Sequence, residues 1–459
     1  MSASDRAGPV SGVAGSLSLE GGRPLVGRVR VPGDKSVSHR ALVIGALAAG
    51  ESVVRGLSDG DDVRRTADAV RALGARVDDG KVSGGPDRLG EPAGPIDLGN
   101  SGTSMRLLAG VVASWPWTVR LVGDASLSAR PMDRVAEPLR LMGAQVSGHS
   151  ARCLPPLTVE GGVLRGLDYT PPVASAQVKS CVLLAGLRAA GDTVVREPVL
   201  TRVHTEELLT RAGARITDER GPGMHVVRVQ ASELVPFELD VPGDPSQAAF
   251  WITAACLVPG SEVTVERIYT GPARRGVLDV LVRMGAALDE VPATRPGDLA
   301  ATSDVVARAG PLVATEVRAE EIPGLDEVPV LAVAAACAEG TTVFRDVGEL
   351  RVKESDRLAG VAELVRAFGA RAEVSGDDLF VDGVPALVPA RFDARFDHRL
   401  AMAAAVAGLA ASAAAGPGGS TASASGPTRV DGWDAVATSY PGFERDLARL
   451  RSDRPRRAR

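Results

Sequence analysis

The sequence has few cysteines and few aromatic residues for a chain of 459 residues. No two cysteines form a C-x-x-C pair, and they lie far apart, at Cys153, Cys181, Cys256 and Cys337. This spacing argues against a zinc ribbon, an iron–sulfur site and a disulfide framework, and it fits a reducing compartment. Aromatic residues make up only 3% of the chain and the net charge is −5, so no nucleic-acid partner is expected.

Long hydrophobic runs and targeting signals are missing too. Residues 1–19 contain no basic segment leading into an apolar run, and the longest apolar stretch, residues 401–415, is mostly alanine and too short to span a bilayer. With 45% hydrophobic and 24% charged residues, the composition is typical of a soluble globular protein. We therefore expect a cytoplasmic protein of roughly two to four domains, with no membrane partner.

Lysine is nearly absent, although 52 residues are basic. It occurs only at Lys35, Lys81, Lys179 and Lys353, and every other basic residue is arginine. A lysine kept in such a background is a candidate for a role that needs a compact charge or an exchangeable proton.

A repeat runs through the chain, in which a hydrophobic residue followed by Gly-Ala recurs at intervals of about 70 residues, the last one longer. The phrase begins at Leu73, Met142, Ala212, Met284 and Phe368. It follows amphipathic segments such as residues 63–73, a pattern typical of a helix that ends at glycine and passes into a strand. We expect these helices to face water.

Each repeat also has an earlier helix, rich in alanine, glycine and serine, that begins with a good N-cap residue. The predicted spans are residues 36–47, 101–112, 175–187, 246–257, 326–337 and 397–409. A β-prone segment follows, for example residues 51–55 or 192–196. The pattern predicts six β-α-β-α-β-β units whose first helices are buried.

Three units lie on each side of residues 240–245, a segment rich in proline and glycine that is typical of a hinge. Residues 416–428 are predicted to form a low-complexity surface loop, and residues 452–459 a basic tail.

Basic residues recur where the first helices begin. Lys35 and Ser36 follow a glycine turn, and Arg106 lies one turn into the second unit's helix. Helix N-termini favour phosphates and carboxylates, and a glycine such as Gly102 lets a ligand approach the backbone. Lys179 repeats the arrangement, which favours a shared ligand site. Taken singly, each motif also fits a plain helix cap with solvated charges.

The fifth and sixth units add proton carriers. Asp326 lies at a helix start, Glu354 precedes Arg357 by three residues, and His398 opens the last small-residue helix. Each alone also fits a cap, a surface ion pair or a core histidine. Together with the basic helix starts, and without any cluster spaced to bind metal, they suit a polyanionic substrate held without metal or other cofactor.

These motifs resemble the enolpyruvyl transferases, and within them the branch that acts on shikimate 3-phosphate. The matching segments, in family order, are PGDKSVSHRAL, LGNSGTSMRLL, ARPM at 129–132, ASAQVKSCVLLAGL, LTRVHTE, LDEVPVLAVAAA, LRVKESDRL and DHRLAMA. They cover nearly the whole chain.

The resemblance implies an α/β fold, a two-domain inside-out α/β barrel built from six βαβαββ repeats, three per domain. The helix N-termini of both domains would face a shared cleft that closes on substrate. The chain would cross near Pro32 and Pro242. The implied domains are residues 32–242 and residues 14–31 with 243–450, and residues 1–13 and 451–459 are expected to be flexible tails.

The implied reaction moves the enolpyruvyl group of phosphoenolpyruvate to the 5-hydroxyl of shikimate 3-phosphate through a tetrahedral ketal, and releases phosphate. By resemblance, shikimate 3-phosphate would contact Lys35, Ser36, Arg40, Ser175, Ala176, Gln177, Thr201, Arg202, Asp326 and Lys353. Phosphoenolpyruvate would contact Lys35, Gly102, Arg130, Gln177, Arg357 and Arg399. The reaction needs two differently placed proton carriers.

We assign Asp326 as the base toward the hydroxyl, and Glu354 as the group that protonates and later deprotonates the methyl carbon. Lys35 would assist, and His398 would support them. Two positions depart from the family pattern: Ala176 stands where many relatives have a second serine, and Thr438 where many have a lysine that binds phosphoenolpyruvate.

The sequence alone leaves two alternatives open. The related UDP-N-acetylglucosamine enolpyruvyl transferases usually carry a reactive cysteine in the loop before the arginine that matches Arg130, and residues 123–129 contain none. A non-catalytic phosphometabolite-binding protein would keep the arginines and lose the proton carriers, yet Lys35, Asp326, Glu354 and His398 are all present. We expect small-molecule substrates and a monomer.

Overall fold

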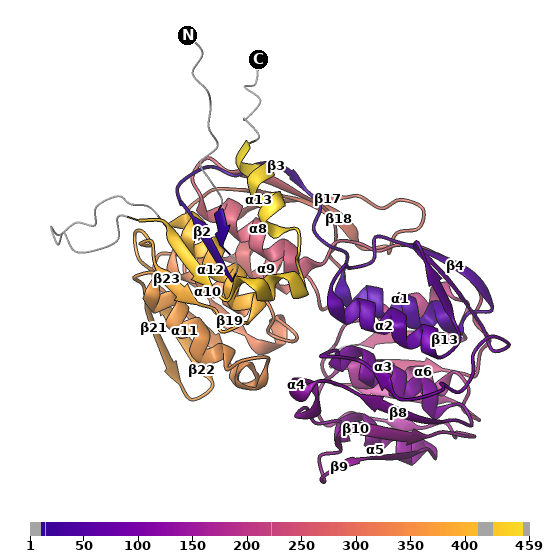
Figure 1. Cartoon of the computed structure of the whole chain (residues 1–459). Helices are drawn as coiled ribbons and strands as arrows, with labels where there is room; N and C mark the ends of the chain where they lie inside the picture. Colours follow the sequence, from indigo (N-terminus) through magenta and orange to yellow (C-terminus); the bar gives the residue numbers. More distant parts are fainter. Residues whose placement is uncertain (1–10, 14, 222, 412–425, 453–459) are drawn as a thin grey trace. The chain divides into compact units, whose positions relative to one another are not determined.

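The computed structural model describes residues 11–13, 15–221, 223–411 and 426–452 (Figure 1). The described residues form two compact units. Unit 1 takes its described residues from Met1–Pro32, Gly243–Thr294 and Ala300–Arg459, and unit 2 takes them from Gly33–Pro242 and Arg295–Leu299. The main chain thus passes into unit 2 after Pro32 and back into unit 1 after Pro242.

Unit 2 alternates helices and short strands. Its helices are α1 (Lys35–Leu47), α2 (Asp61–Ala72), α3 (Gly102–Ala113), α4 (Ala125–Ser128), α5 (Asp133–Met142), α6 (Ala176–Gly186) and α7 (His204–Arg211). Its strands are β4 (Gly50–Arg55), β5 (Arg76–Asp78), β6 (Lys81–Gly84), β7 (Ile96–Asp97), β8 (Thr118–Val122), β9 (Gln145–His149), β10 (Leu154–Glu160), β11 (Asp168–Tyr169), β12 (Thr193–Glu197), β13 (Ile216–Gly221), β14 (Met224–Val229) and β15 (Glu238–Asp240).

Unit 1 follows the same alternation. Its helices are α8 (Pro245–Leu257), α9 (Gly276–Arg283), α10 (Val328–Ala336), α11 (Arg357–Ala367), α12 (His398–Ala410) and α13 (Phe443–Ser452), with 3₁₀ turns η1 (Ala319–Glu321), η2 (Gly348–Val352) and η3 (Trp433–Thr438). Its strands are β1 (Ser11–Val13), β2 (Ser16–Leu19), β3 (Val26–Val29), β16 (Glu262–Tyr269), β17 (Ala287–Pro292), β18 (Thr302–Arg308), β19 (Glu316–Arg318), β20 (Thr341–Arg345), β21 (Arg371–Ser375), β22 (Asp378–Asp382), β23 (Arg391–Asp393) and β24 (Thr428–Asp431).

All of the described strands belong to four-stranded sheets with one pairing pattern, three sheets in each unit. One parallel pair is followed by two antiparallel pairs: β15 runs parallel to β4, β4 antiparallel to β6, and β6 antiparallel to β5. The orders are β15-β4-β6-β5, β7-β8-β10-β9 and β11-β12-β14-β13 in unit 2, and β3-β16-β18-β17, β19-β20-β22-β21 and β23-β24-β2-β1 in unit 1. The predicted α/β class and six repeats are confirmed.

Two repeats exchange their first strands. β3 precedes α1 in sequence but pairs with β16, in the repeat of α8, whereas β15 precedes α8 but pairs with β4, in the repeat of α1. The sixth repeat is completed from the other end of the chain, because β2 pairs with β24. The repeats are therefore regular in space but not contiguous in sequence.

The first helix of each repeat is buried on nearly all sides, as its small residues predict. In α8, for instance, the backbone is surrounded by protein from Pro245 to Cys256. Small residues let helices approach closely: a Cβ added to Gly110 in α3 would lie 2.2 Å from the carbonyl oxygen of Cys181 in α6. The second helices, such as α2, bury one face and expose charged residues on the other.

The apolar run that begins at residue 401 lies largely in α12, whose alanines are buried in the core of unit 1. α12 belongs to the first helices of the repeats. Over the ranges that the structure describes, no helix is long and apolar enough to cross a membrane.

Some predicted boundaries are wrong. The helix expected at residues 326–337 begins at Val328, because Leu325 adopts a left-handed conformation (φ 58°) that turns the chain, and Pro329 suits the first turn of a helix. Residues 11–13, which the sequence places in the N-terminal tail, form β1, and residues 451–452 belong to α13. Thr428 begins β24 instead of ending a loop. Residues 416–425 and 453–459 lie outside the described residues.

Exchanging Gly110 for alanine tests the close approach of α3 and α6. We expect Gly110→Ala to lower the free energy of unfolding by about 1–3 kcal/mol, because the backbone of α6 must move to admit the methyl group. Urea unfolding measures the change. Gly162→Ala is the matched control, since a Cβ there meets nothing within 4 Å. Equal stability of the two variants would contradict the packing described.

Candidate active site

The start of α1 gathers cationic and hydroxyl groups. Asp34 caps the helix with its side chain, which leaves Lys35 and Ser36 in the first turn. Lys35 Nζ lies 3.0 Å from Asp62 Oδ2 on α2, and Ser36 Oγ accepts a hydrogen bond from Arg202 Nη1 (3.1 Å). The backbone N–H groups of a helix start, a lysine and an arginine together favour a phosphate or a carboxylate.

Arg40, further along α1, is buried, whereas Lys35 and Ser36 are partly exposed. Its buried guanidinium donates hydrogen bonds to Thr205 Oγ1 (2.7 Å) on α7 and to Ser180 Oγ (2.8 Å) on α6. It also donates to the backbone carbonyl oxygen of Ser36 (3.0 Å), one turn earlier in α1. Arg40 therefore ties the start of α1 to two neighbouring helices.

The start of α3 holds two arginines against a glycine. Arg106 donates to Gln177 Oε1 (2.8 Å) on α6, and Arg130 donates to Asn100 Oδ1 (2.7 Å). A Cβ on Gly102 would lie 2.9 Å from Arg106 Nη1, so a larger residue would push the Arg106 guanidinium from its place, whereas Arg130 Nη1, at 3.5 Å, would be in ordinary contact. Burial and the charge of Arg130 lower the pKa of Arg106 to about 10, so it remains charged at neutral pH.

The start of α6 supplies hydroxyl and carbonyl groups. Ser175 caps the helix through its hydroxyl, and the Ala176 carbonyl accepts a hydrogen bond from Ser180 Oγ (2.5 Å). Thr201, which precedes α7, is buried and donates to Glu197 Oε1 (2.6 Å) at the end of β12. The structure thus brings every predicted site residue of unit 2 to the starts of α1, α3 and α6 or to the loops beside them.

The expectation that Lys179 belongs to the ligand site is wrong. Its side chain is fully buried, and Nζ lies 2.7 Å from Glu197 Oε2 and 2.7 Å from Glu206 Oε1. The reason is helical phase: Arg106 lies five positions after the cap residue of α3 and Lys179 four after that of α6, and one position turns a side chain by about 100°.

In unit 1, one guanidinium faces three carboxylates. Arg357 begins α11 and is 1% exposed; its nitrogens lie 2.6 Å from Glu354 Oε2, 2.8 Å from Asp397 Oδ2 and 3.2 Å from Asp326 Oδ1. The structure therefore places the two predicted proton carriers on the same cation. Buried arginine in this setting is held by the paired charges around it.

The start of α12 adds a second arginine. Asp397 caps the helix, and the buried Arg399 directs Nη2 toward Asp326 Oδ2, at 3.7 Å. Among the described residues, Nε and Nη1 of Arg399 and Nε2 of His398 have no hydrogen-bond partner. Because buried donors are nearly always paired, the two guanidinium nitrogens of Arg399 point to an anionic ligand.

Charge sets the protonation states in unit 1. Although burial opposes it, the charge of Arg357 lowers the pKa of Glu354 and of Asp397. Burial, assisted by the neighbouring arginines, lowers the pKa of His398 to about 3. At neutral pH the carboxylates are therefore ionised and the imidazole is neutral.

Two further positions singled out in the sequence lie at the ends of short 3₁₀ turns. Lys353 follows η2, with Nζ 4.0 Å from Glu349 Oε1. Thr438 ends η3 and is exposed. Over the described part of the chain, no group of three or more His, Cys, Asp or Glu side chains could hold a metal ion.

Comparison with known proteins identifies the fold first. The structure is similar to the enolpyruvyl transferase NikO from Streptomyces tendae, with a TM-score of 0.73 over 95% of this chain and 98% of that one, at 22% identity. The paired units of three repeats thus define the fold of an enolpyruvyl transferase. Residues 19–447 match the family described as EPSP synthase (3-phosphoshikimate 1-carboxyvinyltransferase), and the chain belongs to this family.

More similar proteins agree. A 3-phosphoshikimate 1-carboxyvinyltransferase of a Synechococcus species is 46% identical over 449 residues, which cover 95% of this chain and 99% of the relative. The crystal structure of EPSP synthase from Acinetobacter baumannii has a TM-score of 0.82 at 37% identity, and the match covers 95% of this chain and 98% of that one. The family predicted from the sequence motifs is confirmed. The chain is a transferase of the shikimate pathway.

The sequence did not reveal several residues whose side chains contact the predicted site residues. Asn100 and Asp62 contact Arg130 and Lys35, and Asp397 contacts Arg357. Asp397 was visible in the sequence only as a helix cap. No spacing rule connects Asp62 with Lys35, because their contact depends on how α2 packs on α1.

Removing the charge of Asp397 tests the role of the cluster around Arg357. We expect Asp397→Asn to lower the free energy of unfolding by about 2–3 kcal/mol, since the buried guanidinium loses one ionised partner. Asn still offers an oxygen to cap α12, so the loss reports on charge. Asp356→Asn at the exposed cap of α11 is the control.

The difference should depend on pH. Because the pKa of Asp397 is lowered in the folded state, its contribution is present above the unfolded pKa, about 4, and is lost as pH falls through the folded pKa. Denaturant unfolding of both variants between pH 3 and pH 7 measures this. A pH-independent difference would show that the charge of Asp397 does not stabilise the cluster.

Proposed function

We propose residue roles for the reaction of this family, in which the chain moves the enolpyruvyl group of phosphoenolpyruvate to the 5-hydroxyl of shikimate 3-phosphate and releases phosphate. This step leads toward chorismate and the aromatic amino acids. The observation that carries the proposal is the cluster in unit 1: Asp326 and Glu354 share Arg357, and unpartnered donors of Arg399 lie beside them. Such a site binds an anion and moves protons next to it.

Shikimate 3-phosphate is assigned to the helix starts of α1 and α6 in unit 2, with two groups from unit 1. The assigned residues are Lys35, Ser36, Arg40, Ser175, Ala176, Gln177, Thr201, Arg202, Asp326 and Lys353. The hydrogen bond from Arg202 to Ser36 supports this grouping, because it places a guanidinium beside the N-terminus of α1. Arg40 acts mainly by joining α1 to α6 and α7.

Phosphoenolpyruvate is assigned to a set of cations with a small residue among them. The set is Lys35, Gly102, Arg130, Gln177, Arg357 and Arg399. The free donors of Arg399 support its place. We add Arg106 as a positioning residue, because it holds the Gln177 amide and lies against Gly102.

The proton steps follow from charge. In the addition, Asp326 takes the proton of the 5-hydroxyl, the hydroxyl oxygen bonds to C2 of phosphoenolpyruvate, and Glu354 protonates the methylene carbon. In the elimination, Glu354 takes a proton back from the methyl group, the C=C bond forms again as the bond from C2 to the phosphate oxygen breaks, and the proton held by Asp326 leaves with the phosphate. The anionic substrate raises the pKa of Glu354 on binding, because like charges disfavour the ionised form. Lys35 assists, and neutral His398 supports Glu354.

We also propose a cytoplasmic monomer with domains at residues 32–242 and at residues 14–31 with 243–450. The change from one compact unit to the other at Pro32 and Pro242 supports these two boundaries, while Arg295–Leu299 belong to unit 2.

Phosphate release from the two substrates tests the function. Purified protein should release phosphate only when shikimate 3-phosphate and phosphoenolpyruvate are both present. Glu354→Gln should lower kcat at least about a hundredfold, because the amide cannot carry the proton. Phosphate release with UDP-N-acetylglucosamine in place of shikimate 3-phosphate would overturn the substrate assignment. No phosphate release with either acceptor would favour a non-catalytic binding protein.

Replacing Arg399 separates the two substrates. Arg399→Gln should raise KM for phosphoenolpyruvate by about ten- to a hundredfold, because charged hydrogen bonds to the anion are lost, while KM for shikimate 3-phosphate stays near its original value. Arg391→Gln on β23, an exposed arginine of the same unit, is the control. A change confined to shikimate 3-phosphate would contradict the assignment.

A further inference from the structure

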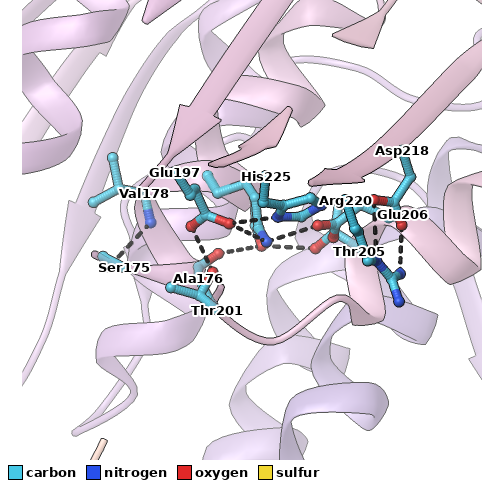
Figure 2. A network of polar contacts seen from close by, with 12 residues as sticks. Ser175, Ala176, Val178, Glu197, Thr201, Thr205, Glu206, Asp218, Arg220 and His225 are labelled. Atoms are coloured by element: carbon cyan, nitrogen blue, oxygen red, sulfur yellow. Dashed lines mark hydrogen bonds and ion pairs between the residues drawn. The ribbon is translucent and has the colours of Figure 1, made fainter. Parts of the chain in front are cut away.

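A network of charged side chains in unit 2 includes Lys179, near the start of α6 (Figure 2). It joins α6, α7 and three strands of one sheet, and its members are Lys179 on α6, Glu197 on β12, Glu206 on α7, Asp218 and Arg220 on β13, and His225 on β14. The Lys179, Glu197, Glu206 and His225 side chains are almost completely buried. None of the six appears in the substrate sets proposed above.

Contacts within this charge network fix the state of His225. Its Nδ1 lies 3.0 Å from Glu197 Oε2 and its Nε2 lies 2.6 Å from Asp218 Oδ1. An ionised carboxylate only accepts hydrogen bonds, so both ring nitrogens carry protons and the imidazole is positively charged. Although burial opposes it, these two hydrogen bonds raise the pKa of His225.

With His225 charged, the network is neutral. Lys179, Arg220 and His225 supply three positive charges, and Glu197, Glu206 and Asp218 supply three negative ones. A compact ammonium suits the position of Lys179, since Nζ must fit between two carboxylates at 2.7 Å each. Neutrality matters because an unpaired buried charge is strongly unfavourable.

The network touches the proposed substrate site at one point. Thr201 Oγ1 donates to Glu197 Oε1 (2.6 Å), and the next residue, Arg202, donates to Ser36 Oγ at the start of α1. Figure 2 shows Thr201 reaching Glu197 from the loop before α7. Glu197 thus holds the segment that carries two proposed contacts to shikimate 3-phosphate.

We infer that Glu197, kept ionised by Lys179 and His225, is a positioning residue that holds Thr201 and Arg202 ready for shikimate 3-phosphate. The inference rests on the proposed function, because it needs Thr201 and Arg202 to contact that substrate. It gives Glu197 no contact with the reacting atoms.

A pH dependence follows from the surroundings of His225. The groups around it are Glu197, Asp218, Lys179 and Glu206, with Arg220 held by Asp218. When His225 loses its proton, one ring nitrogen can no longer donate, and the network carries an unbalanced negative charge. The positioned state is therefore present at lower pH and is lost as pH rises through the raised pKa of His225.

Steady-state kinetics across pH test the inference. Glu197→Gln should raise KM for shikimate 3-phosphate about tenfold and leave KM for phosphoenolpyruvate within about twofold, because only the Thr201 segment loses its charged anchor. In the unaltered protein, KM for shikimate 3-phosphate should rise at alkaline pH. His225→Gln should keep it raised and remove that pH dependence. Asp168→Asn, an exposed carboxylate on β11 paired with Arg196, is the matched control.

The outcomes separate the two claims. An unchanged KM for shikimate 3-phosphate in Glu197→Gln, or an equal rise for both substrates, would overturn the positioning role. If that variant does not fold, His225→Gln decides, and a pH profile like that of the unaltered protein would overturn the inference. Absence of phosphate release by the unaltered protein would overturn the proposed function and the inference together. Release combined with a raised KM in Thr201→Val but not in Glu197→Gln would overturn the inference alone.

Discussion

The arrangement of this protein depends on the pairing of charges removed from water. A buried ammonium or guanidinium is tolerated only when carboxylates or hydrogen-bond acceptors surround it. Arg357 in unit 1 and Lys179 in unit 2 both meet this condition, each through more than one carboxylate. In the proposed function, the helix starts beside them present Lys35, Arg399 and their neighbours to an anionic substrate. The proposed catalytic and binding residues are therefore held in place by buried ion pairs.

The buried helices provide the geometry that this pairing needs. Because α1, α3 and α6 are built from small residues, they pack closely enough for Arg106 of α3 to reach Gln177 of α6. Larger side chains would separate the helices and break such contacts. Packing and binding are thus linked: the same residues that fill the core set the distances between the polar groups at the helix ends.

Much of this architecture could be predicted from the sequence, because local signals control it. N-cap residues, small-residue helices and Gly-Ala phrases identified the repeats, and family motifs identified the reaction. The contacts between helices and strands could not be predicted from the sequence. Lys179 shows why: its helix start resembles that of α3, but a shift of one position turns it toward Glu197 and Glu206 instead of the proposed ligand site. Asp326 likewise lies in a turn that forms because Leu325 adopts a left-handed backbone conformation. No local sequence motif predicts this conformation.

The exchange of β3 and β15 has a consequence for synthesis on the ribosome. The elements from α1 to β15 can assemble as soon as they emerge, whereas β2 and β3 must wait for β24 and β16, which are made later. Unpaired strand edges invite association with other chains. Each waiting strand is only four residues long, so little edge is open during that interval. The same topology means that unit 1 has no continuous coding segment, and a truncation that keeps the later repeats would remove strands from two of its sheets.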